Sequence, residues 1–197
     1  MSLPLRIVKV GGSLLSLPDL AARLQHWLSQ QPEARNVLLA GGGLLADAIR
    51  TWDERFQLGE ETSHWLCVDL LDVMAGTLHQ ILKKQGIVCQ LSNSLEQLSA
   101  APLLVFAPAQ FLREQESGLA GCKLPHSWQA TSDSIAARLA EVCQADELVL
   151  LKSSPPSATF GDSSGSGEGY VDEHFPHATR NTPSMRFFDL RAITDID

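Results

Sequence analysis

The stretch Ile7-Val8-Lys9-Val10-Gly11-Gly12-Ser13 decides the fold, because an apolar strand runs directly into two glycines and a serine. Strands that end in glycines leave bare backbone N–H groups at the tip, where a phosphate can approach closely. Lys9 adds a positive charge just before the glycines. The stretch therefore predicts an anion site at the carboxyl end of a buried first strand.

A second glycine turn follows the next expected strand. Residues 37–40 are apolar, Gly41-Gly42-Gly43 comes directly after them, and a helix is expected through residues 44–52. A strand, three glycines and a helix bring free N–H groups and the positive end of the helix dipole to one point. The alternative is a tight turn that needs glycine only for close packing. A second such turn after a lysine-bearing strand favours the anion site.

Strands and helices alternate along the rest of the chain. We expect further strands at residues 87–91, 103–107, 147–151 and 185–190, and helices at residues 60–84 and after Thr131-Ser132-Asp133. This order is typical of a three-layer αβα sandwich with a mostly parallel central sheet. Ligands in such folds bind at the carboxyl ends of the strands, where Lys9, the glycines and Lys152 all fall.

Two further charged residues are candidates for the same site. Lys152 ends a very apolar strand, which is unusual unless the side chain meets an anion or reaches outward to water. Asp133 has two interpretations. It either suits the dipole of the helix that follows, with Thr131 or Ser132 as the cap, or it faces the two lysines.

The expected long helix over residues 60–84 carries His64 near its start, and Asp69 and Asp72 share one of its faces. Taken alone, these residues are best explained as a solvated acidic face with a surface histidine. If the helix lines a pocket, they would bind a polar or cationic group of a substrate.

Composition excludes several classes of protein. The 197 residues suit one domain, and the net charge of −8 argues against general nucleic-acid binding. The four cysteines form no C-x-x-C pair and the histidines are scattered, so we expect reduced thiols and no metal site. No signal peptide or membrane span is evident, which predicts a cytoplasmic protein. The P-loop and G-x-G-x-x-G patterns are absent.

Residues 153–170 are rich in serine, proline and glycine, so we expect a mobile loop there. It is either a tolerated insertion or a lid that closes over a nucleotide. We expect a single domain over residues 1–197, with a core for the acceptor and phosphate site at 1–145 and a shorter nucleotide-side part at 146–197.

Three segments together resemble the amino acid kinase superfamily, which includes acetylglutamate, aspartate, uridylate and isopentenyl phosphate kinases. They are Lys9-Val10-Gly11-Gly12-Ser13, Gly41-Gly42-Gly43, and residues 131–137 with the sequence Thr-Ser-Asp-Ser-Ile-Ala-Ala. The resemblance implies an amino acid kinase-like fold and transfer of the γ-phosphoryl group of ATP, with Mg²⁺ carried mainly by the nucleotide. The short length and the stretch at residues 58–65 look like the branch that includes the aminomethylfuran-methyl phosphate kinase of methanofuran biosynthesis.

The resemblance also implies roles for particular residues. The family's catalytic roles fall on Lys9 and on Asp133, which would orient the lysines. The family's second catalytic lysine is not identifiable downstream, so either Lys152, at the end of its strand, replaces it or nucleotide binding is weakened. The phosphates of ATP would lie at Gly11, Gly12, Ser13 and Ser153. The acceptor would lie at Gly41, Gly42 and Gly43, with His64 and Asp69 beside it. The family usually has a Thr-Asp pair where Lys152-Ser153 stands, and a longer nucleotide-side half.

The expected acceptor is a small phosphate or carboxylate compound. One candidate is a furan-methyl phosphate of methanofuran and tetrahydromethanopterin-linked C1 metabolism. The expected partners are this small molecule, ATP and further copies of the chain, with no nucleic acid or membrane. The short nucleotide-side half keeps an alternative open, which is a non-catalytic binding, storage or regulatory module on the same fold.

Overall fold

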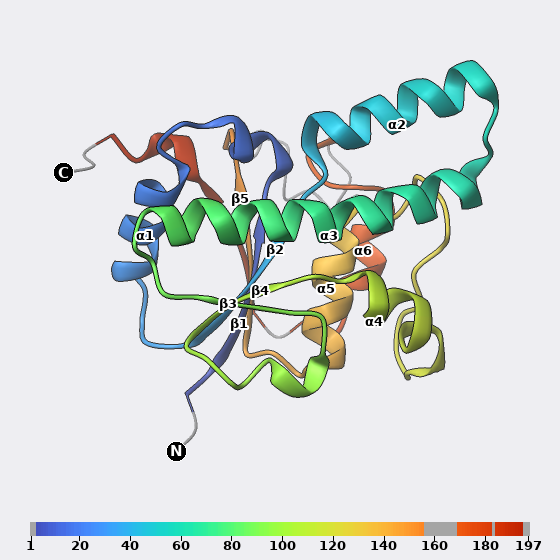
Figure 1. The fold of residues 1–197 in the computed structure, drawn as a ribbon. Coiled ribbons are helices and arrows are strands. Elements are labelled where there is room, and N and C mark those ends of the chain that lie inside the picture. Colours follow the sequence, from blue (N-terminus) through green and yellow to red (C-terminus); the bar gives the residue numbers. More distant parts are fainter. Residues whose placement is uncertain (1–2, 156–168, 183, 195–197) are drawn as a thin grey trace.

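A six-stranded sheet forms the centre of the computed structural model, which describes residues 3–155, 169–182 and 184–194. The strand order is β3-β4-β2-β1-β5-β6, and each pairing among these strands is parallel. The strands are β1 (Leu5–Val10), β2 (Arg35–Ala40), β3 (Gln90–Ser92), β4 (Leu103–Phe106), β5 (Glu147–Lys152) and β6 (Met185–Asp189). The predicted three-layer α/β architecture is confirmed (Figure 1).

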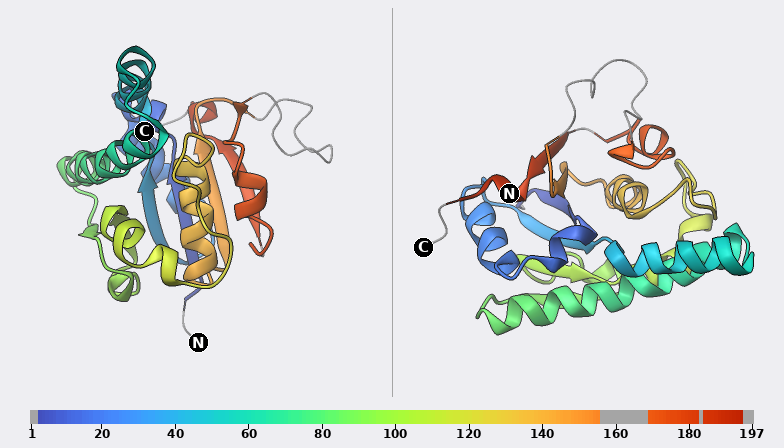
Figure 2. Two further views of the ribbon diagram at one scale, coloured as in Figure 1. Left: turned by 90° about the vertical axis from the view of Figure 1, so that its right-hand side faces the viewer. Right: turned by 90° about the horizontal axis from the view of Figure 1, so that it is seen from above.

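Helices cover both faces of the sheet (Figures 1 and 2). They are α1 (Leu20–Ser29), α2 (Gly43–Phe56), α3 (Glu60–Lys84), α4 (Ala109–Glu114), α5 (Ser132–Val142) and α6 (Phe175–Ala178). One core cluster joins the sheet to α4, α5 and α6, and a second joins the opposite face to α1. The long α3 contributes buried residues to both clusters. This helix is long and apolar enough to cross a bilayer, a criterion that buried core helices also meet.

Strand alternation sets the direction of the two strand lysines. In β1, Ile7 packs in the cluster on the α5 side, so Lys9, two residues later, points to the same face. In β5, Leu148 and Leu150 belong to that cluster, and Lys152 continues their alternation. Because β1 and β5 are neighbours, both lysines reach the start of α5.

Two elements differ from the sequence prediction. The strand expected at 87–91 begins at Gln90, because the chain from α3 first closes a helix cap. Gly86 has a φ of +75°, and the Ile87 N–H donates to the Leu82 carbonyl at 3.1 Å. Helix α4, Ala109–Glu114, is not among the helices that the sequence predicted. Most of the predicted mobile loop, residues 156–168, lies outside the described residues.

Candidate active site

Lys9, Asp133 and Lys152 meet at the carboxyl ends of β1 and β5. The Lys9 Nζ lies 2.8 Å from Asp133 Oδ1, and the Lys152 Nζ lies 2.6 Å from Asp133 Oδ2. Only 6% of the Asp133 side chain is exposed, against 7% for Lys9 and 13% for Lys152. The alternative in which Asp133 serves only the helix dipole is wrong, because the carboxylate lies between both ammonium groups.

The electrostatics of this group leave an excess of positive charge. Burial alone would raise the pKa of Asp133, but the two lysines outweigh it and lower that pKa, so the carboxylate stays ionised. Burial and the neighbouring Lys9 lower the pKa of Lys152, and Asp133 opposes them. Two cations share one buried anion, so the group can accept a further negative charge from a ligand.

The two glycine turns touch each other at the end of the sheet. A Cβ on Gly12 would lie 2.1 Å from the Gly43 nitrogen, and one on Gly43 would lie 2.7 Å from the Gly12 oxygen. Gly43 also has a φ of +55°, which few other residues adopt. Close packing of the turns therefore requires glycine here, with or without a bound anion.

The N–H groups of these turns fall into two sets. Gly11 donates to the Leu151 carbonyl at 2.9 Å and Gly41 donates to the Val10 carbonyl at 2.9 Å, so both N–H groups are used within the protein. We therefore do not expect the Gly11 N–H to hold a phosphate. Gly43 begins α2, whose first-turn N–H groups lack intrahelical partners and border the cavity described next.

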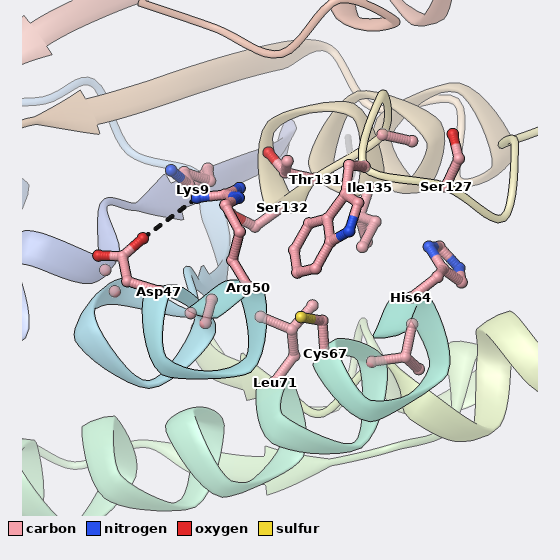
Figure 3. Close-up of a pocket in the computed structure, with 17 residues that line it drawn as sticks. Lys9, Asp47, Arg50, His64, Cys67, Leu71, Ser127, Thr131, Ser132 and Ile135 are labelled. Atoms are coloured by element: carbon pink, nitrogen blue, oxygen red, sulfur yellow. Dashed lines mark hydrogen bonds and ion pairs between the residues drawn. The ribbon is translucent and has the colours of Figure 1, made fainter. Parts of the chain in front are cut away.

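A cavity of about 210 Å³ opens beside Lys9 and lies between α2, α3 and the start of α5 (Figure 3). One end holds Lys9, Arg50 and Asp47, and the other holds His64 and Ser127. The remaining lining residues are Gly12, Gly42, Gly43, Ala46, Cys67, Val68, Leu71, Trp128, Ala130, Thr131, Ser132 and Ile135. The cavity is thus polar at both ends, with apolar side chains between them.

A second, wider hollow of about 550 Å³ lies beside Lys152. It is lined by Arg50, Glu60, Trp128, Gln129, Thr131, Asp133, Lys152, Gly169, Tyr170, Val171, Asp172 and Glu173. Lys9 lines the first cavity and Lys152 lines this hollow, with Asp133 between the two lysines. The charged group therefore separates two spaces that ligands can enter.

Comparison with known proteins agrees with this arrangement. The model of the Amino acid kinase family matches residues 4–156. The chain belongs to the amino acid kinase family. This confirms the resemblance drawn from the lysine, the two glycine turns and the Thr-Ser-Asp segment.

This amino acid kinase family member is similar to one curated protein in sequence and to solved structures in fold. The chain is 25% identical over 149 residues to [5-(aminomethyl)furan-3-yl]methyl phosphate kinase of Methanocaldococcus jannaschii. That match covers 74% of this chain and 64% of the relative, so the chain spans just under two thirds of the relative's length. Among solved structures, UMP kinase from Bacillus anthracis is similar, with a TM-score of 0.62 at 10% identity. That likeness covers 96% of this chain and 88% of the other, and it shows the fold alone.

His64, one of the predicted acceptor residues, is buried and lines the cavity. Its ring stacks on His126, with centroids 5.1 Å apart and planes 21° apart. Burial, helped by the neighbouring His126, lowers the pKa of His64 to about 4. The interpretation as a surface histidine is wrong, and the side chain faces the cavity as a neutral imidazole at pH 7 (Figure 3).

Asp69 and Asp72 do not face the cavity. Asp69 is exposed and pairs with Arg113 of α4 at 2.7 Å, which contradicts its predicted contact with the acceptor. Asp72 accepts the N–H of Ala109 at 2.9 Å and so supports the start of α4. Helical spacing identified their common face, but α4 packs beside it, and the sequence did not predict that neighbour.

Ser13 and Ser153, both predicted at the phosphates of ATP, come together at the tips of β1 and β5. The Ser13 hydroxyl donates to the Ser153 hydroxyl at 3.0 Å. The parallel pairing of β1 with β5 explains this contact across 140 residues of chain.

Asp172 is a structural partner of the site that sequence reasoning missed. Its carboxylate accepts the N–H and hydroxyl of Thr131, each at 2.8 Å, together with the N–H of Ser134 at 3.1 Å and the hydroxyl of Ser134. Thr131 itself makes no side-chain cap, so the predicted local cap of α5 is wrong. Two residues before Asp172, the Tyr170 carbonyl accepts the Lys152 ammonium at 2.7 Å. Residues 170–172 therefore hold both Lys152 and the turn that carries Asp133.

Proposed function

We propose that this member of the amino acid kinase family is an ATP-dependent small-molecule kinase. It transfers the γ-phosphoryl group to a small phosphate or carboxylate acceptor. The observation that carries the proposal is the pair of lysines that share the buried Asp133 between two hollows. An excess of buried positive charge at the ends of parallel strands is suited to the negative charge of a phosphoryl group in transfer.

The two hollows suit the two substrates. The first cavity, next to the start of α2, would take the acceptor, with Gly42, Gly43 and His64 on its wall. The wider hollow beside Lys152 would take ATP, whose phosphates would lie near Ser13 and Ser153. The donors beside Lys152 are its ammonium group and the hydroxyls of Ser13 and Ser153 at the strand tips, which are suitable ligands for phosphate oxygens. Glu60, Asp172 and Glu173 also line the hollow, so the charge of bound Mg²⁺ would assist the nucleotide there.

The reaction needs positioning and charge balance more than covalent chemistry by the protein. One oxygen of the acceptor attacks the γ-phosphorus while the bond from that phosphorus to the bridging oxygen of ADP breaks. The electron pair of the broken bond leaves with ADP. A phosphate or carboxylate oxygen is already anionic at pH 7, so no base is needed. Lys9 and Lys152 balance the developing charge, and Asp133 holds their ammonium groups in place.

Mg²⁺ would neutralise charge on the phosphates of ATP when it is bound. Within residues 3–155, 169–182 and 184–194, no group of three His, Cys, Asp or Glu side chains is placed to hold a metal ion. Asp133, the carboxylate at the centre of the site, is already paired with two lysines. We therefore expect the phosphates of the nucleotide to carry the ion.

For the acceptor, a furan-methyl phosphate is the first candidate, since the Methanocaldococcus jannaschii relative is named for one. Transfer to its phosphate would produce a diphosphate. This acceptor would place the protein in methanofuran and tetrahydromethanopterin-linked C1 metabolism, and a cytoplasmic location would follow.

Association into a homo-oligomer is also part of the proposal. Leu44, Trp52 and Phe56 of α2 are 76%, 53% and 63% exposed, and they follow one another at multiples of four residues. Apolar stripes of this kind often mark interaction surfaces. Sedimentation velocity of the purified chain tests this part, and a monomer at micromolar concentration would contradict it.

Lys9→Ala tests the kinase proposal. We expect kcat to fall by about 100-fold or more, because Lys9 supplies charge stabilisation in the transition state. The measurement is ADP release with the furan-methyl phosphate, with the product identified by mass spectrometry. Lys84→Ala, an exposed lysine at the end of α3, is the matched control and should leave kcat unchanged. Equal turnover by Lys9→Ala and the wild type would refute the assignment.

Calorimetry with Mg-ATP separates the kinase from a non-catalytic module. A kinase binds the nucleotide and releases ADP when an acceptor is present. A protein that binds phosphate or a metabolite but no nucleotide would be the binding or regulatory module instead.

A further inference from the structure

Arg50 is a further cation at the site, and it takes no part in the contacts among Lys9, Asp133 and Lys152. It lies on α2, and it lines both the acceptor cavity and the hollow beside Lys152. Its side chain is 46% exposed, and its guanidinium lies 3.3 Å from Asp47. Figure 3 shows this side chain extending from α2 to the level of Lys9 and Thr131.

The position of Arg50 is supported by Trp128. The guanidinium carbon lies 4.6 Å from the centroid of the Trp128 ring. The ring is fixed in turn, because its Nε1–H donates to Asp53 Oδ2 at 2.7 Å. Asp53 also accepts the Gly59 N–H at 2.9 Å, so it joins the end of α2 to the loop before α3. A guanidinium stacked on a fixed ring loses less freedom when it binds a ligand.

The charges of the cavity are unequal at its two ends. At one end, Lys9 and Arg50 line the cavity beside the start of α2, and Asp47 is the one carboxylate among the lining residues. Asp133 pairs with both Lys9 and Lys152, so three cations are balanced by two carboxylates and this end keeps an excess of positive charge. The far end holds His64, whose low pKa keeps it neutral at pH 7, and the Ser127 side chain. A ligand with one anionic group will therefore place that group at the end that holds Lys9 and Arg50.

We propose that Arg50 recognises the anionic group of the acceptor, a phosphate or carboxylate, and that Trp128 is the positioning residue that orients it. The planar guanidinium matches either group with two parallel N–H···O bonds. Lys9 is then left to balance the phosphoryl group in transfer. This inference rests on the proposed function, because it takes the cavity to be the acceptor site.

Calorimetry without turnover tests the inference. The probes are [5-(aminomethyl)furan-3-yl]methyl phosphate, the alcohol that lacks its phosphate, and Mg-ADP. Arg50→Ala should weaken binding of the phosphate compound by about 10- to 100-fold, since hydrogen bonds to charged groups are worth that much. Binding of the alcohol should stay within about twofold, and Mg-ADP, whose hollow Arg50 also lines, should weaken less than the phosphate compound. Arg55→Ala, on the same helix and outside the cavity, is the control and should change nothing.

Two further variants separate recognition from structure. Arg50→Lys should recover only part of the lost affinity, because an ammonium cannot form the paired contact. Trp128→Phe keeps a ring but removes the bond to Asp53, so it should weaken the phosphate probe more than the alcohol. Circular dichroism melting of each variant checks that the chain is folded.

Several results would overturn the inference. Equal losses for the phosphate and the alcohol would show that Arg50 only shapes the cavity. A selective loss of Mg-ADP affinity would assign Arg50 to the nucleotide. A wild-type protein that binds neither the phosphate probe nor inorganic phosphate would also refute it.

Failure of the kinase proposal can be distinguished from failure of the Arg50 inference. If phosphate binding depends on Arg50 but no ADP forms with any acceptor, the anion site stands and the kinase does not. If ADP forms and the acceptor KM of Arg50→Ala equals that of the wild type, the kinase stands and Arg50 has no role.

Discussion

Helix α5 carries two buried charge clusters that differ in what surrounds them. At its first turn, Asp133 lies between Lys9 and Lys152, and these residues line two hollows. Further along the helix, Arg138 is fully buried and pairs with Glu116 at 2.8 Å and with Glu141 at 2.7 Å. The first cluster has one anion between two cations, and the second has one cation between two anions.

The closed cluster is satisfied by the protein itself. Arg138 also donates to the carbonyls of Ala120, Leu119 and Glu116 at 2.8, 3.1 and 3.3 Å. Glu141 further accepts the Cys122 N–H at 3.1 Å. Most contacts of this cluster hold the loop before α5 in place, and Asn181 also donates to Glu141 at 2.8 Å, so the role is structural.

The open cluster is satisfied less fully. Among the described residues, the Lys9 ammonium has one ionic partner, Asp133, although it carries three donors. Among those residues, Asp133 Oδ1 has the Lys9 ammonium, at 2.8 Å, as its single partner. A buried charge cluster with donors left over beside a cavity indicates a ligand site, and one with every donor engaged indicates a structural brace.

Arg138→Met breaks the closed cluster and gives the largest expected loss of stability. The free energy of unfolding should fall by about 3–5 kcal/mol, because two carboxylates and several carbonyls lose their buried partner. Urea denaturation measures this value. Mg-ADP affinity of the folded variant should stay unchanged, since Arg138 lines neither hollow.

Lys9→Met is the matched variant in the open cluster. It should lower stability by only about 1 kcal/mol, because Lys152 still balances Asp133. Equal losses of stability for Lys9→Met and Arg138→Met would contradict the conclusion that the first cluster is a ligand site and the second a structural one.

The sequence predicted the open cluster well and the closed one not at all. The carboxyl ends of the expected parallel strands place Lys9 and Lys152 at one edge of the sheet. For Asp133 the local pattern left two interpretations open, and the family resemblance supplied its place between the lysines. Arg138 was not singled out, because its contacts depend on how the loop at residues 115–123 folds back. The same limit explains Asp172, which caps α5 from 38 and 41 residues away.

Asp172→Asn tests whether the position of Asp133 in the open cluster depends on the hydrogen bonds that Asp172 makes to the start of α5. The variant removes the negative charge that accepts from Thr131 and Ser134 at the start of α5. We expect a loss of about 2 kcal/mol in unfolding free energy, as for a helix cap with charged hydrogen bonds. Because Asp133 lies in the same turn, kcat should fall while the KM for the acceptor changes little.

Asp172→Glu and Glu33→Gln are the controls for that variant. The first keeps the charge and should recover part of kcat, and the second removes an exposed charge and should have no effect. A normal kcat in Asp172→Asn would show that the cap stabilises α5 without aligning Asp133.

Glu141→Gln tests the closed cluster through the pH dependence of stability. Burial alone would raise the pKa of Glu141, but hydrogen bonds from Asn181, Arg138 and Cys122 lower it below its ordinary value of 4.5. As the pH falls below 4.5, Glu141 binds a proton in the unfolded chain but stays ionised in the folded protein, so the free energy of unfolding falls. The variant lacks this group, so its unfolding free energy should depend less steeply on pH between about pH 5 and pH 3.

At pH 7 the loss of unfolding free energy in Glu141→Gln should be about 1 kcal/mol, because the amide still fits and keeps part of the hydrogen bonding. Thermal melts across this pH range measure the slope, and a slope equal to that of the wild type would show that Glu141 is not held ionised by the brace.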